Sequence, residues 1–136
     1  MSKHRVFIFM SEPVVGELTE FRLRLLDLEP IVLSSNEELE SELENGLPSL
    51  FMLDLDLAET DTTQLIEKLA SDEITSRIPI LCVSREGDMG EAERAYQAGA
   101  RDFLVIPYDP LVLERKVLRT LESLGAPVSE QQGISL

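Results

Sequence analysis

The chain has 136 residues, of which 43% are hydrophobic and 28% charged, and its formal net charge is −14. This length accommodates one domain with a buried core but not two. No apolar run approaches the roughly 20 residues that a membrane-spanning helix needs, and no secretory signal leads the chain, so we expect a cytoplasmic protein. The acidic charge repels polyanions, which predicts protein partners and no direct nucleic-acid binding.

Histidine and cysteine are too scarce for several kinds of catalysis. The one histidine, His4, stands near the N-terminus, and the one cysteine, Cys82, lies inside an apolar run. Zinc sites with Cys and His ligands, Cys-His pairs and Ser-His-Asp triads all need an imidazole held by the fold. We therefore expect no enzyme of these classes, and we expect Cys82 to be a small buried side chain.

Five short apolar runs recur at fairly even spacing. Each run is continuous rather than alternating, which is typical of strands in a parallel sheet that is covered on both faces. The gaps between them are long enough for crossover helices. The runs comprise residues 6–10, 31–33, 50–55, 78–83 and 103–106.

Helical periodicity fills the gaps between these runs. In the first gap an apolar residue recurs every three or four positions, which predicts an amphipathic helix. The segment after the last run has the same pattern. The apolar positions are Val14, Leu18, Phe21, Leu25 and Leu28 in the first helix, and Val117, Leu118, Leu121 and Leu124 in the last.

Helix-start and helix-stop signals agree with this periodicity. Short oxygen-bearing side chains precede each of four predicted helices, where an N-cap belongs, and glycines follow three of them, where a helix ends. The N-cap candidates are Ser35, Asp61, Asp88 and Asp109, and the stop candidates are Gly46, Gly99 and Gly125.

Strands and helices therefore alternate five times. Right-handed crossovers leave few topologies, and the sequence predicts a doubly wound α/β sheet of five parallel strands in the order 2-1-3-4-5. We expect the domain to span residues 1–124. The polar, aperiodic residues 125–136 are typical of a flexible tail or linker.

Function in such sheets gathers beyond the carboxyl ends of the strands, where the strand order reverses. Asp54 stands at the tip of the most apolar strand, and Ser84 ends the neighbouring one. A phosphate-binding loop after the first strand is not indicated, because Glu12 repels a phosphate and Pro13 has no N–H to donate. This pattern argues against a flavodoxin-like cofactor binder.

Four stretches, in this order and spacing, resemble the response-regulator receiver family (CheY-like) across residues 5–124. The resemblance implies a flavodoxin-like three-layer (βα)5 sandwich in two-component phosphorelay signal transduction. It also implies a protein partner, either a histidine kinase or a downstream signalling protein. The stretches are Glu12-Pro13 and residues 48–55, 78–84 and 98–110.

The same resemblance assigns roles to individual residues. It puts Asp54 at the phosphoacceptor position and makes Ser84 and Phe103 the switch positions. Each role competes with a purely structural one. Asp54 could be a solvated carboxylate at a strand end, Ser84 a cap of the next loop, and Phe103 a permanent part of the core.

The departures from the family pattern are specific. Met10 and Ser11 stand where receivers carry the acidic pair that holds Mg²⁺, and Ile106 stands at the lysine position. A thioether is a poor ligand for Mg²⁺, and an isoleucine cannot pair with a phosphoryl group. These losses predict a degenerate site without a metal or other cofactor. Glu12, Asp54 and Asp56 are weak candidates for residual metal ligands.

Two functions remain open. The first is a degenerate receiver that binds other proteins without phosphorylation. The second is a functional phosphoacceptor receiver that a histidine kinase phosphorylates on Asp54, which would require Mg²⁺.

Positive charge gathers late in the chain, in the region that receivers use for partner and dimer contacts. This region spans residues 88–124 and includes Tyr96 and Tyr108. We expect a homodimer, or the docking of an acidic partner, through this face. Seven of the twelve basic residues lie from Arg77 onward: Arg77, Arg85, Arg94, Arg101, Arg115, Lys116 and Arg119.

Overall fold

The computed structural model describes residues 4–85 and 89–122, where five strands and five helices alternate. Within these ranges, no helix combines the length and the apolar character that crossing a membrane demands. The elements are β1 (Arg5–Phe9), α1 (Pro13–Leu25), β2 (Glu29–Leu33), α2 (Asn36–Asn45), β3 (Leu50–Asp54), α3 (Thr62–Ser71), β4 (Ile80–Ser84), α4 (Met89–Ala98), β5 (Asp102–Val105) and α5 (Pro110–Glu122).

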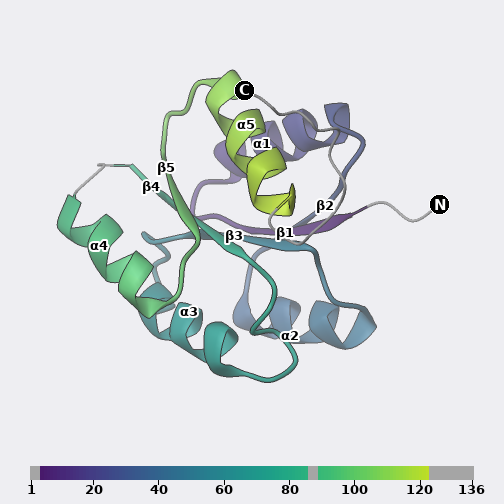
Figure 1. Cartoon of the computed structure of the whole chain (residues 1–136). Coiled ribbons are helices and arrows are strands. Elements are labelled where there is room, and N and C mark those ends of the chain that lie inside the picture. The colour runs from purple at the N-terminus through teal and green to yellow at the C-terminus, as the bar shows by residue number, and fades with distance from the viewer. Residues whose placement is uncertain (1–3, 86–88, 123–136) are drawn as a thin grey trace.

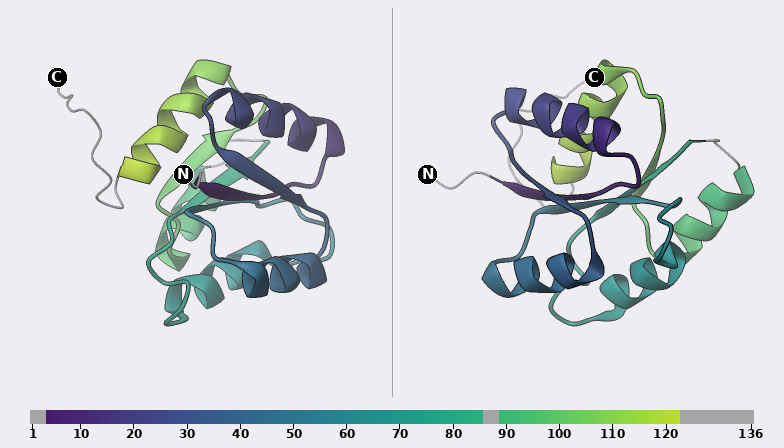
Figure 2. Two further views of the ribbon diagram at one scale, coloured as in Figure 1. Left: turned by 90° about the vertical axis from the view of Figure 1, so that its right-hand side faces the viewer. Right: turned by 180° about the vertical axis from the view of Figure 1, so that it is seen from behind.

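The strands form one parallel sheet in the order β2-β1-β3-β4-β5, which confirms the predicted topology. Helices α1 and α5 cover one face of the sheet, and α2, α3 and α4 cover the other (Figures 1 and 2). A hydrophobic core lies on each face of the sheet, and alternate residues of β1 point into one core or the other. Val6 and Ile8 belong to the cluster beneath α1 and α5, whereas Phe7 and Phe9 belong to the cluster beneath α2, α3 and α4.

Local capping sets the ends of the helices. The N-caps predicted at Ser35 and Asp61 are confirmed, because each side chain accepts a hydrogen bond from the backbone N–H three residues later. Asp109 accepts one from the N–H two residues later. The predicted cap Asp88 and the predicted stop Gly125 lie outside the described residues.

Glycines end α2 and α4 as predicted, at Gly46 and Gly99. Gly99 has a φ of 131°, in the left-handed region that favours glycine. A Cβ atom at this position would lie 2.6 Å from the Cβ of Ala70 on α3. Gly99 therefore permits both the turn into β5 and the close approach of α3.

The expected buried face of α1 is wrong. Val14, Leu18, Phe21 and Leu25 are exposed, with exposed fractions between 49% and 76%, and only Leu28, beyond the end of the helix, is buried. The helix instead buries a second stripe, which hydrophobic periodicity does not reveal because it contains a glycine and a threonine. That stripe is Gly16, Thr19 and Leu23.

The last helix follows its predicted pattern more closely. Val117 and Leu121 are buried in the core beneath α1 and α5. Leu118, expected in the same apolar stripe, is instead exposed, and Leu124 lies outside the described residues.

Candidate functional site

Asp54 ends β3 and is almost fully buried, with 1% of its surface exposed. Its Oδ2 atom accepts hydrogen bonds from the backbone N–H and the hydroxyl of Ser11, at 2.8 and 2.7 Å. Its Oδ1 atom accepts one from the backbone N–H of Asp56, at 2.8 Å. A buried carboxylate needs such partners, and Asp54 finds all three inside the protein. The expectation of a solvated Asp54 is therefore wrong.

Arg85 lies beside Ser11 and Asp56 at the carboxyl ends of the strands. The residue follows β4 directly, and its guanidinium donates to the Ser11 hydroxyl at 3.0 Å. The guanidinium also pairs with Glu12 at 3.3 Å and lies 3.9 Å from a carboxylate oxygen of Asp56. The positive charge of Arg85 therefore lies near the carboxylates of Glu12 and Asp56, and it contacts the same Ser11 hydroxyl that binds Asp54.

Ser84 ends β4 and is fully buried. Its hydroxyl donates to the carboxylate of Glu91, in the first turn of α4, at 2.5 Å. In parallel register Asp54 pairs with Val83, so Ser84 lies one step beyond it on the neighbouring strand. The fold therefore brings Asp54 and Ser84 to adjacent strand ends, but the hydroxyl is bonded to α4.

Ile106 and Met10 both belong to the core beneath α1 and α5. Ile106 has 2% of its surface exposed and is joined to Pro107 by a cis peptide bond. The hydroxyl of Thr19 on α1 donates a hydrogen bond to the sulfur of Met10, at 3.9 Å. Both side chains therefore serve packing, as their apolar character predicts.

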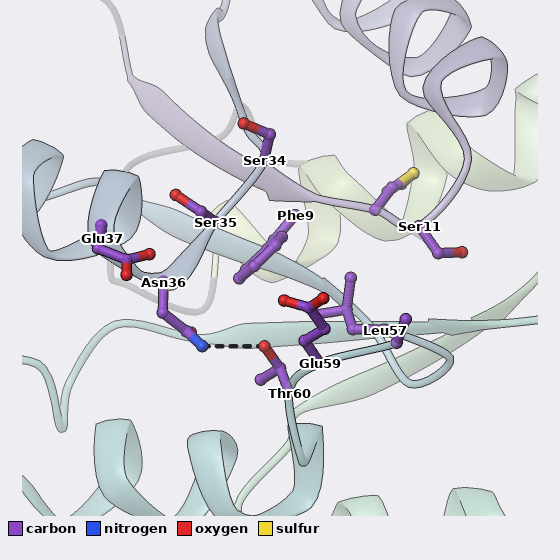
Figure 3. A pocket seen from close by; sticks show the side chains of 11 residues that line it. Phe9, Ser11, Ser34, Ser35, Asn36, Glu37, Leu57, Glu59 and Thr60 are labelled. Atoms are coloured by element: carbon purple, nitrogen blue, oxygen red, sulfur yellow. Dashed lines mark hydrogen bonds between the residues drawn. The ribbon is translucent and has the colours of Figure 1, made fainter.

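A half-open hollow of about 550 Å³ lies beside this edge, and Figure 3 shows its lining. The hollow is rich in hydroxyl groups, but several of its polar groups already have partners within the chain. Asn36 donates to Thr60, as the dashed line in Figure 3 marks, and Ser34 donates to Glu38. Its lining residues are Phe9, Met10, Ser11, Ser34, Ser35, Asn36, Glu37, Leu57, Ala58, Glu59 and Thr60.

Cys82 lies in β4, fully buried as predicted. Burial and, to a lesser degree, the negative charge of Glu91 raise the pKa of the Cys82 thiol to about 12. The thiol is therefore protonated at neutral pH and inert as a nucleophile. Among the described residues, no three His, Cys, Asp or Glu side chains are grouped so that they could hold a metal ion.

The family comparison agrees with this architecture. A family model described as the response regulator receiver domain matches residues 6–118, which is most of the chain. The chain belongs to the response regulator receiver family. As a receiver domain it is a signalling module rather than a classical enzyme.

Curated relatives of this receiver domain include transcriptional regulators. The chain is 25% identical to the phosphate regulon transcriptional regulatory protein PhoB of Escherichia coli, over 97% of its own length and 59% of the PhoB length. It is 28% identical to the probable transcriptional regulator ycf27 of Pyropia yezoensis, over 93% of this chain and 54% of that protein. The chain thus spans little more than half the length of these relatives.

Solved structures share the same fold. A candidate response regulator from Chloroflexus aurantiacus superposes with a TM-score of 0.83 at 27% identity, covering 89% of this chain and 99% of that one. A CheY-like receiver domain protein from Methanospirillum hungatei superposes with a TM-score of 0.81 at 20% identity, covering 91% and 98%.

Phe103 on β5 is the second switch position that the family resemblance assigns. It is half-buried and packs against the core beneath α2, α3 and α4. The interpretation of Phe103 as fixed core stays a prediction. Sequence reasoning missed Arg85, which it counted only as one of several basic residues. The available signal was its place directly after Ser84, at the edge where Asp54 and Asp56 were already expected.

Proposed function

We propose that this receiver domain is a degenerate, phosphorylation-independent protein-interaction module. The observation that carries the proposal is the hydrogen-bonded state of Asp54. Three donors from Ser11 and Asp56 occupy its two carboxylate oxygens, and Arg85 lies against the same Ser11 hydroxyl. Asp54 is thereby held by the fold as a structural carboxylate.

The residues around Asp54 do not fit Mg²⁺. This ion requires hard oxygen ligands in octahedral geometry, usually including carboxylates and water. Met10 offers only a sulfur atom, which faces Thr19 in the core. The Ser11 hydroxyl donates a hydrogen bond to Asp54 and accepts one from Arg85. The guanidinium of Arg85 also offsets part of the negative charge that Glu12 and Asp56 would offer to a divalent cation.

A phosphoryl group on Asp54 would also lack the lysine that the family carries where this chain has Ile106. In phosphoryl transfer, catalysis comes mainly from positioning and from neutralising the charge on the equatorial oxygens. The buried Ile106 side chain cannot neutralise any charge. Each such electrostatic contact contributes about 3 kcal/mol to transition-state stabilisation, so losing the lysine and the metal slows transfer by orders of magnitude.

A second candidate function is phosphorylation of Asp54 by a histidine kinase. One observation favours it: Arg85 brings a positive charge to the strand edge, and its side chain is 40% exposed. If the guanidinium left Glu12, it could reach a phosphoryl group on Asp54.

A small-molecule phosphodonor separates the two functions. The purified chain is incubated with acetyl phosphate and Mg²⁺, and its intact mass is recorded alongside that of an Asp54→Asn control. The proposal predicts that neither protein gains a phosphoryl group. A gain of mass in the natural chain that the Asp54→Asn variant lacks would support the second candidate.

Receiver domains interact with histidine kinases or with downstream proteins. For this chain we place the partner contact on α4, β5 and α5. The face carries exposed Arg94, Arg101, Arg115 and Arg119, which favour an acidic partner. Lys116 contributes less charge to the face, because it pairs with Asp102 at 2.9 Å.

An aromatic anchor is also available on this face. Tyr96 is exposed and lines an apolar hollow of about 520 Å³ on α4, together with Met89. The other tyrosine of this region, Tyr108, is half-buried, and its hydroxyl shares a hydrogen bond with Thr19. Tyr96 is therefore the better placed of the two for partner binding.

The partner contact has its own test. Affinity for a captured acidic partner is compared between the natural chain, the Arg115→Glu and Arg119→Glu double variant, and Asp54→Asn. We expect the charge reversals to abolish binding and Asp54→Asn to leave it unchanged. The opposite outcome would show that binding requires an ionisable residue at position 54.

A further inference from the structure

Helix α1 presents a stripe of large apolar side chains to solvent. The four residues are Val14, Leu18, Phe21 and Leu25, with exposed fractions of 76%, 49%, 56% and 60%. Their spacing is four, three and four residues, which is the spacing of the a and d positions in a coiled coil. We call these four residues the α1 seam.

The α1 seam is narrow and points away from the sheet. At about 100° per residue, the four positions fall within a sector of about 60° on the helix. The opposite side of the helix carries Gly16, Thr19 and Leu23, which are buried against the domain. A surface helix normally shows polar groups on its outer face, so a seam of this kind indicates a helical partner.

We propose that a second copy of this chain covers the seam, through an antiparallel pairing of the two α1 helices about a two-fold axis. The four-three-four spacing reads the same in both directions. In the antiparallel pair, Val14 therefore meets Leu25 of the second copy, and Leu18 meets its Phe21. Such a contact is self-complementary and closed, as a symmetric dimer requires.

The charges beside the seam suit this orientation. Glu17 and Arg24 lie on the same flank of α1, and reversing the second helix puts each Glu17 next to an Arg24. Arg24 is 58% exposed and pairs in its own helix with Glu20, an exposed i, i+4 contact that is easily exchanged. Two Glu17–Arg24 pairs then form across the dimer.

A parallel pairing is less well supported. It would bring Glu17 next to Arg22 of the second copy, since these positions flank the seam at g and e. Arg22, however, is engaged with Glu114 of α5 in its own chain, at 2.7 Å, and its side chain is 26% exposed. The charges therefore select the antiparallel arrangement.

Helix α5 lies beside α1 on the same face of the sheet (Figures 1 and 2). Its exposed side adds two further apolar residues, Leu111 and Leu118, one heptad apart. Two copies that meet through α1 would bring α5 close to the contact and extend the area buried.

The dimer should be weak and should strengthen with salt. The seam is about 16 Å long, which puts the interface at the low end of the size range for specific complexes. Each copy also carries a net charge of −14, so the copies repel one another until salt screens them. We expect association in the micromolar to millimolar range of protein concentration.

Sedimentation equilibrium of the whole chain tests the proposal. The natural chain should reach a dimer, and Leu18→Glu should raise the dissociation constant about a hundredfold, because each copy loses an apolar contact and gains a charge in the seam. Leu47→Glu is the matched control, since Leu47 is 46% exposed and lies outside α1. The control should dimerise like the natural chain.

Disulfide trapping tests the orientation. The native thiol, Cys82, is buried and does not interfere. Under oxidation, the double variant Val14→Cys with Leu25→Cys should form covalent dimers, whereas Val14→Cys alone should not, because the two copies of residue 14 lie at opposite ends of the seam.

Several outcomes would overturn the proposal. A chain that stays monomeric at millimolar concentration would show that a second copy does not cover the α1 seam. A dimer that survives Leu18→Glu but dissociates with Arg115→Glu and Arg119→Glu would move the interface to α4, β5 and α5. Efficient trapping by Val14→Cys alone would show a parallel pair.

Discussion

Ser11 binds Asp54 twice, through its backbone N–H at 2.8 Å and through its hydroxyl at 2.7 Å, and both bonds end on the same carboxylate oxygen. By family resemblance, position 11 belongs to the acidic pair that holds a metal. In this chain the residue stabilises the carboxylate directly. A serine at this position supplies a hydrogen-bond donor where the family resemblance implies an acidic side chain.

Ser11→Ala should therefore destabilise the fold. The variant removes one of three donors to a carboxylate that is 1% exposed, which costs about 1–2 kcal/mol of unfolding free energy. Urea denaturation measures the change. Ser34→Ala is the control, because the Ser34 hydroxyl donates to the carboxylate of Glu38 in an exposed position, and it should cost less than about 0.5 kcal/mol. Equal costs would show that Asp54 does not depend on Ser11.

Ile106→Lys should lower stability rather than restore a functional site. Ile106 is 2% exposed in the core beneath α1 and α5, so an ammonium group there loses its hydration. We expect a loss of about 3 kcal/mol, visible as a lower melting temperature. Val105→Lys changes the neighbouring residue, which is 44% exposed, and should be nearly neutral. An increase in melting temperature for Ile106→Lys would contradict the packing of this site.

Cys82 should report unfolding. Burial raises the pKa of its thiol from the ordinary 9.0 to about 12, so the folded thiol remains protonated where the unfolded one ionises. The contribution of this thiol to stability is fully present below pH 9.0 and is lost as the pH rises toward 12. Labelling with a thiol reagent at about pH 8, followed by mass spectrometry, should proceed no faster than the chain opens. Rapid labelling of the folded chain would contradict this burial.

The sheet was predictable because its signals are local and repeated. Continuous apolar runs, cap residues such as Ser35 and Asp61, and right-handed crossovers favour one topology, and the structure has it. The buried face of α1 was not predictable from periodicity alone. Two stripes compete on this helix, and the larger side chains, such as Phe21 and Leu25, belong to the exposed one.

The site was predictable only in part. Asp54 and Ser84 reach adjacent strand ends because parallel strands end at one edge of the sheet. Hydrogen-bond directions depend on side-chain rotamers, which a sequence pattern does not specify. The bond from Ser84 to Glu91 and the approach of Arg85 to Ser11 are of this kind.

We propose that Asp54 is a structural carboxylate in a site that holds no Mg²⁺. The most direct measurement is an NMR titration of the chain with millimolar Mg²⁺ and then with a beryllofluoride phosphoryl mimic, following the backbone amides of Ser11, Asp54 and Ser84. We expect these signals to stay in place through both additions. Saturable shifts of all three amides with Mg²⁺, followed by slow exchange to a new state with beryllofluoride, would contradict it.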